Sequence, residues 1–93
     1  AAIVDFTGDE VLAIRTVASQ FEQNDKDQLL YLSKFAATSN LVTFRLELDC
    51  RLNQEVLTVE QVNNIGQLMN ALKVTDETVR HLAKALEYVA LLA

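Results

Sequence analysis

The chain has 93 residues, of which 51% are hydrophobic and 23% are charged, a composition that excludes an intrinsically disordered chain. The length suits one domain with one hydrophobic core, so we expect residues 1–93 to form a single domain. The net charge of −5 opposes binding to nucleic acid and to anionic membranes, because like charges repel.

Turn-forming residues are scarce along the whole chain. There is no proline, and the two glycines are Gly8 and Gly66. Compact β domains usually use several of both residue types in their turns, so this scarcity favours helices. We therefore predict an all-α fold, an irregular bundle of four to five short helices in a single helical domain.

The first two predicted helices have recognisable start signals. Thr7 with Glu10 forms a capping box, which satisfies backbone N–H groups at a helix start. The apolar residues that follow at helical spacing are Val11, Ile14, Val17, Ala18 and Phe21. Polar residues at 22–27 interrupt this pattern, and Asn24 or Asp25 can cap a second helix. Its apolar stripe comprises Leu29, Leu32, Phe35 and Ala36.

Residues 41–52 fit two secondary structures, because apolar and polar residues alternate strictly from Val42 to Leu52. Alternation is typical of a half-buried strand, which could pair with its twin and direct Arg45 at DNA. On a helix, the same residues form two apolar stripes. Leu, Glu and Arg favour helix, so we predict a helix packed on two sides, with Cys50 in the core.

Two further helices are predicted after this segment. Thr58 with Gln61 forms a second capping box, which precedes apolar residues at helical spacing, namely Val62, Ile65, Met69 and Leu72. Thr75 is predicted to start the last helix. Asp76 and Glu77 would then lie in its first turn, where the helix dipole favours negative charge.

The end of the last helix is apolar on every side, from Tyr88 to Ala93. Such a helix must be buried all round. Either it is the central helix of the bundle, or a partner protein or a second subunit covers it. The second interpretation predicts a homodimer or protein complex whose contact surface comprises Tyr88, Val89, Leu91 and Leu92.

An alternative function comes from residues 59–86, which resemble a helix-turn-helix unit of DNA-binding transcription regulators. The predicted DNA contacts are Thr78, Arg80, His81 and Lys84. The segment departs from the motif at Lys73, where Gly is usual, and at Met69, where a small residue is usual. Asp76 and Glu77 would also meet the phosphates.

No constellation of residues predicts catalysis. The single histidine, His81, lies four residues after Glu77, and two such ligands fall short of a zinc site. Nothing in the spacing of Cys50 and His81 indicates a nucleophile and its base. The paired carboxylates lie at predicted helix starts, where capping already explains them. We therefore expect no enzyme activity, no metal and no cofactor.

One cysteine in a compact chain is typical of a reducing compartment, and no stretch is long and apolar enough for a membrane span. A cytoplasmic location is therefore expected, without membrane contact. The function that we predict is a non-enzymatic helical module for protein–protein interaction, serving in regulation or assembly, with a protein partner or a second copy of itself. Nucleic acid remains a disfavoured alternative partner.

Overall fold

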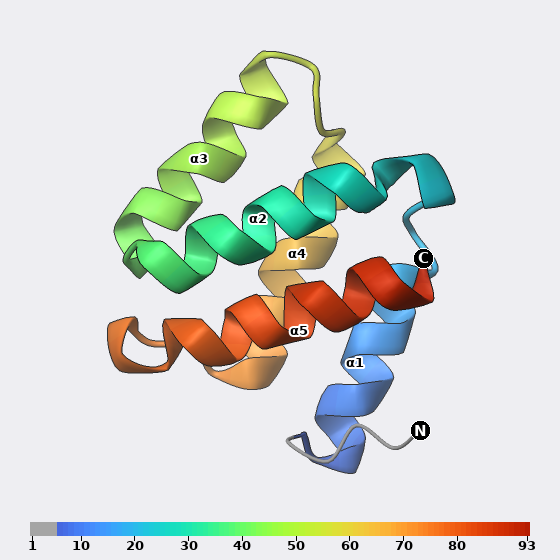
Figure 1. Ribbon diagram of the computed structural model, residues 1–93, viewed down its shortest axis with the longest axis vertical. Coiled ribbons are helices and arrows are strands. Elements are labelled where there is room, and N and C mark those ends of the chain that lie inside the picture. The colour runs from blue at the N-terminus through green and yellow to red at the C-terminus, as the bar shows by residue number, and fades with distance from the viewer. Residues whose placement is uncertain (1–5) are drawn as a thin grey trace.

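The computed structural model describes residues 6–93, which form five α-helices and two short 3-10 helices (Figure 1). The α-helices are α1 (Gly8–Ala18), α2 (Lys26–Thr38), α3 (Leu41–Asn53), α4 (Val59–Leu72) and α5 (Val79–Leu92). The 3-10 helices η1 (Gln23–Asp25) and η2 (Asp76–Thr78) precede α2 and α5. The predicted all-α fold is confirmed.

Two helix starts follow the sequence signals, and a third, which was not predicted, is also capped by a side chain. Thr7 and Glu10 form the predicted capping box of α1, in which each side chain accepts a hydrogen bond from the backbone N–H of the other residue. Thr58 and Gln61 do the same for α4. Asn40 caps α3, since its Oδ1 accepts from the Thr43 N–H at 2.9 Å. Side chains adjacent in sequence therefore fix these starts locally.

The other two starts differ from the prediction. Asp25 accepts a hydrogen bond from the Glu22 N–H at 2.9 Å, and this contact shapes η1 rather than capping α2. The Thr75 N–H donates to the Thr78 Oγ1 at 2.8 Å, so a 3-10 turn forms and α5 begins at Val79. In both places, a side chain accepts from the backbone N–H three residues earlier and closes a 3-10 turn, and the α-helix begins after that turn.

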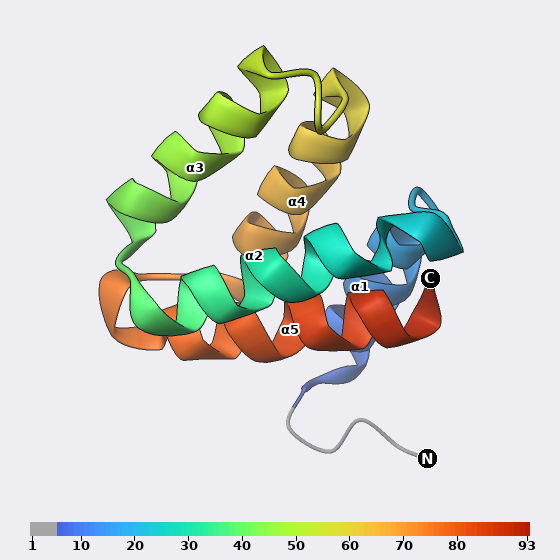
Figure 2. The same ribbon diagram turned by 45° about the horizontal axis from the view of Figure 1, so that its top comes forward.

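Helices α2 and α5 form the centre of the bundle and run side by side in opposite directions (Figures 1 and 2). Ser33 on α2 is buried, and its hydroxyl donates to the Ala83 carbonyl of α5 at 2.6 Å. Helix α1 packs against both α4 and α5. All five α-helices contribute to the core, whose largest fully buried side chains are Phe44, Ile14, Leu29, Leu32, Ile65, Leu68, Leu82, Leu86 and Val89.

The apolar last helix is buried mainly by its own chain. The buried residues of α5 are Val79, Leu82, Ala83, Ala85, Leu86, Val89 and Ala90. Helix α2 covers one side of α5 and α1 covers another, while Leu91 and Leu92 stay exposed at the end. The interpretation as a central helix therefore holds up to Ala90.

Residues 41–53 form a helix and not a strand, but α3 packs on one side only. Phe44 and Leu48 are buried on that side. The second stripe is exposed: Val42 is 66% exposed, Leu46 is 62% exposed, and Cys50 is an exposed free thiol. The predictions of two-sided packing and of Cys50 in the core were therefore wrong. The reason is that α3 leans outward from the bundle and meets its neighbours through one face (Figure 2).

Candidate interaction surface

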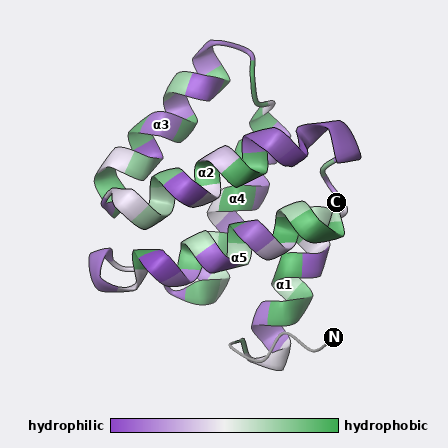
Figure 3. Cartoon of the chain, in the orientation of Figure 1, coloured by the Kyte–Doolittle hydropathy of each residue, from purple (hydrophilic) through white to green (hydrophobic). Residues whose placement is uncertain are grey.

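The main exposed apolar feature of α3 is a line of three side chains, Val42, Leu46 and Cys50, which we call the α3 stripe. These residues are four positions apart and so lie along one face of the helix. Hydropathy colouring shows hydrophobic segments of α3 alternating with hydrophilic ones (Figure 3). Because Phe44 and Leu48 pack in the core on the opposite face, α3 presents the stripe to solvent.

The two edges of the α3 stripe differ in their charged groups. At about 100° per residue, Arg45 and Asp49 fall on one edge, and both side chains are exposed. The other edge carries Glu47, whose carboxylate lies 3.7 Å from Arg51 Nε. Arg51 also lies over the Tyr31 ring, with its Cζ 4.2 Å from the ring centroid, and contacts Gln28. The Glu47 carboxylate is thus already engaged in an ion pair within the chain.

An open groove of about 500 Å³ separates α3 from α4, and Arg45 and Asp49 line its α3 side. Its α4 side carries the amide side chains of Asn63, Gln67 and Asn70 together with the apolar residues Val62 and Met69, and Leu48 lines the groove from α3. The exposed charged edge of the α3 stripe therefore continues into a polar groove. This arrangement resembles the polar rim that surrounds the apolar centre of protein interfaces.

Gly66 also lines this groove, and a Cβ atom placed on it would meet no atom within 4 Å. Gly66→Ala should therefore raise the free energy of unfolding by about 0.5–1 kcal/mol, because glycine within a helix loses more backbone entropy on folding than alanine. Urea denaturation of both proteins measures the difference. A loss of stability in the variant would show that the groove closes over Gly66.

A second open groove, of about 340 Å³, lies between α1 and α4. It is lined by Leu12, Ala13 and Val17 of α1 and by Leu68 and Ala71 of α4. Leu12 is 64% exposed. It matches Leu46 in residue type and exposure, although the two leucines belong to different helices.

The four residues of the contact surface predicted at the C-terminal end differ in their exposure in the structure. Val89 is fully buried, so it cannot belong to an exposed contact surface. Tyr88 is half-buried, and its ring meets that of Phe6 edge-on at a centroid distance of 5.8 Å. Leu91 and Leu92 remain exposed, at 61% and 50%. What is left of the predicted surface is a pair of leucines in the last turn of α5.

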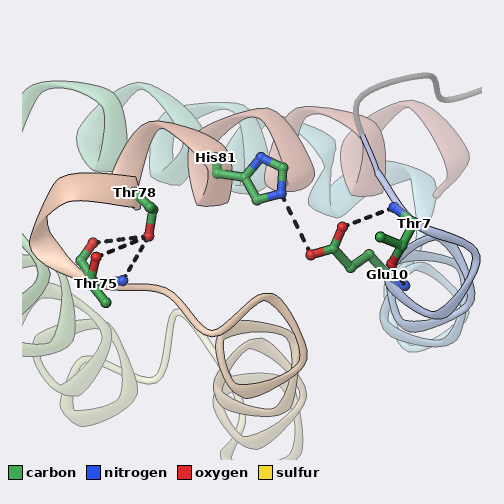
Figure 4. Close-up of polar contacts among 5 residues, drawn as sticks. All are labelled: Thr7, Glu10, Thr75, Thr78 and His81. Carbon is green, nitrogen blue, oxygen red and sulfur yellow. Dashed lines mark hydrogen bonds and ion pairs between the residues drawn. The ribbon is translucent and has the colours of Figure 1, made fainter.

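Two of the four predicted DNA contacts, His81 and Thr78, are engaged within the chain. His81 Nε2 lies 3.7 Å from Glu10 Oε2 (Figure 4). The His81 ring also packs on that of Phe6, with centroids 4.4 Å apart. Thr78 is engaged with Thr75. Arg80 and Lys84 are exposed on α5. Lys73, which stands where the motif usually has Gly, adopts a left-handed conformation with φ of 53°. Glycine adopts this conformation readily.

Among residues 6–93, no three His, Cys, Asp or Glu side chains gather as metal ligands. The carboxylate beside His81 belongs to Glu10 of α1 and not to Glu77. Cys50 lies exposed on the outer face of α3.

Sequence reasoning recognised Val42, Leu46 and Cys50 as a stripe but assigned them to the core. Charged residues border both stripes of the helix, because Arg51 lies next to the buried face and Asp49 lies next to the exposed one. The local charge pattern therefore does not distinguish the buried stripe from the exposed one. The α3 stripe was therefore recognisable in the sequence, but its exposure was not.

The described helices are also too short or too polar to cross a lipid bilayer.

No family model, no curated protein and no solved structure matches the chain. Function must consequently be argued from the geometry of the chain itself, and the α3 stripe is its most distinctive surface.

Proposed function

We propose that this protein is a non-enzymatic helical module that binds a protein partner through the α3 stripe. The observation that carries the proposal is the exposure of Val42 and Leu46 along one line of a helix whose opposite face is buried. Contiguous apolar surface with a polar border is characteristic of protein-binding sites. Regulation or assembly, rather than catalysis, is the role that such a surface serves.

The shape of the surface indicates the chemistry of the partner. Side chains four residues apart form a ridge, and ridges of this kind pack into the grooves of another helix. The partner should therefore present an apolar helix face, with charged groups that complement Arg45 and Asp49. An exposed cysteine in the contact surface is compatible with a reducing compartment, so we propose that the complex forms in the cytoplasm.

The direct test is affinity capture of tagged protein from nuclease-treated extract of its host, comparing wild type with Leu46→Glu. The amount of partner captured by the variant should be lower than that captured by wild type by about tenfold or more, because burying an unpaired carboxylate at the centre of an interface is costly. Leu12→Glu is the matched control, since Leu12 is equally exposed on α1. It should retain the partner.

Circular dichroism should show that both variants keep the helicity of wild type, since both leucines are exposed. Loss of the partner by Leu12→Glu but not by Leu46→Glu would move the interaction to the groove between α1 and α4. Capture that neither substitution changes would contradict a role for the α3 stripe.

The DNA-binding alternative has weaker support. Two of its four predicted contacts, His81 and Thr78, are engaged within the chain. The net charge of −5 opposes it further. If duplex DNA did bind, its affinity would fall as the salt concentration rises, because cationic side chains release counterions from the phosphates. Removing Arg80 and Lys84 would weaken the binding and reduce this dependence on salt, because fewer counterions would then be released.

A further inference from the structure

We propose that the partner of the α3 stripe is the α3 stripe of a second copy of this chain, packed antiparallel about a two-fold axis. This inference depends on the proposed function, because it names the occupant of the same surface. Two-fold dimers are the commonest oligomers, and their interface uses one patch of each subunit twice. The patch must therefore be complementary to itself.

The charged edge of the α3 stripe has this self-complementarity. When two copies of a helix pack antiparallel about a two-fold axis, the same edge of each helix meets its symmetry mate. Arg45 and Asp49 share one edge and lie one turn apart. Arg45 of each copy then lies beside Asp49 of the other. The symmetric arrangement therefore contains two pairs of opposite charge, one on each side of the axis.

A parallel arrangement is less favourable for two reasons. In a parallel pair, the edge with Arg45 would meet the opposite edge, where Glu47 is already paired with Arg51 and its side chain is only 18% exposed. The dipoles of two parallel helices also repel each other, whereas those of antiparallel helices attract. Both effects favour the antiparallel orientation.

The size of the surface predicts weak association. Helix α3 has 13 residues, which corresponds to a length of about 20 Å. A contact centred on this helix is smaller than the roughly 800 Å² per partner of a standard interface. Each copy also carries a net charge of −5, so the two copies repel each other at long range until salt screens them. We therefore expect a dissociation constant in the range of about 10–100 µM at physiological salt.

The test exchanges the charges at the two positions. Arg45→Asp places acidic groups at both positions, and Asp49→Arg places basic groups at both, so each variant alone should dimerise at least about tenfold more weakly than wild type. An equimolar mixture of the two variants should associate again, because every contact then joins an acid to a base. The double variant Arg45→Asp with Asp49→Arg should also dimerise like wild type.

Sedimentation velocity over a concentration series, with one variant carrying a mass tag, measures these states. Both substituted side chains are exposed, and circular dichroism should confirm an unchanged fold. Recovery of the dimer in the mixture would establish that Arg45 meets Asp49 of another copy. Weakening by Arg45→Asp but not by Asp49→Arg would overturn the antiparallel orientation, because it would indicate contact with Glu47 instead.

Two other outcomes separate this inference from the proposed function. Suppose that wild type remains monomeric up to about 1 mM and still captures another protein, with Leu46→Glu abolishing this capture. In that case the inference of a second copy as partner is wrong, and the proposed protein-binding function stands. If wild type neither dimerises nor captures a partner through Leu46, both are wrong. A dimer that survives Leu46→Glu and both charge variants would also overturn the inference, because it would use another surface.

Discussion

Phe44→Ala should lower the free energy of unfolding by about 3–5 kcal/mol, the range found for truncation of fully buried aromatic side chains. Phe44 has no exposed surface, and its ring lies 6.5 Å from that of Phe35 on α2. It is therefore a principal anchor of α3 on the bundle. Since domains of this size are stable by only about 5–15 kcal/mol, the loss would be a large fraction of the total.

Leu46→Ala, two residues further along the same helix, is the control for this prediction. Leu46 is 62% exposed in the monomer, so its truncation should change stability by less than about 0.5 kcal/mol in dilute protein. Urea denaturation followed by circular dichroism measures both variants. A cost for Leu46→Ala as large as that for Phe44→Ala would show that the α3 stripe is buried within one chain.

Val89→Asp should destabilise the protein by about 4 kcal/mol or more, since a carboxylate without a partner would replace a fully buried side chain. Val89 belongs to the face of α5 that packs in the core. Thermal unfolding followed by circular dichroism should therefore show a strongly lowered transition, or no folded protein at all.

Leu91→Asp tests the opposite expectation in the same helix. Leu91 is 61% exposed, and its replacement should change stability by about 0.5 kcal/mol or less. The double variant Leu91→Asp with Leu92→Asp should likewise keep the native mass of wild type. A change of native mass in the folded double variant would instead favour the C-terminal contact surface predicted from the sequence.

The sequence was informative where structure is determined locally. Thr7, Thr58 and Asn40 lie at helix starts because each bonds a backbone N–H three residues away, within the same turn. The periodicity of residues 41–52 also correctly predicted a helix with two apolar stripes. It did not predict which stripe faces the core, because Phe44 and Leu46 are similarly hydrophobic. That choice depends on where α2 lies.

Tertiary packing also decided two other features. The last helix is central because α1 and α2 both cover it, and no property of residues 79–92 distinguishes that outcome from coverage by another subunit. His81 pairs with Glu10, which is distant in the chain, whereas helical spacing had suggested Glu77. Local spacing predicts which groups share a helix face, but not which groups of other helices approach that face.

The central claim is that the exposed face of α3 is the surface through which this protein binds another chain, a second copy of itself. The most direct measurement is a dilution series of two-dimensional methyl spectra of the assigned protein, which reports each surface separately. Concentration-dependent shifts of the Val42 and Leu46 methyl groups, with those of Leu12, Leu91 and Leu92 unchanged, are the predicted result. Shifts confined to Leu91 and Leu92, or to Leu12, would contradict the claim and move the contact to the end of α5 or to α1.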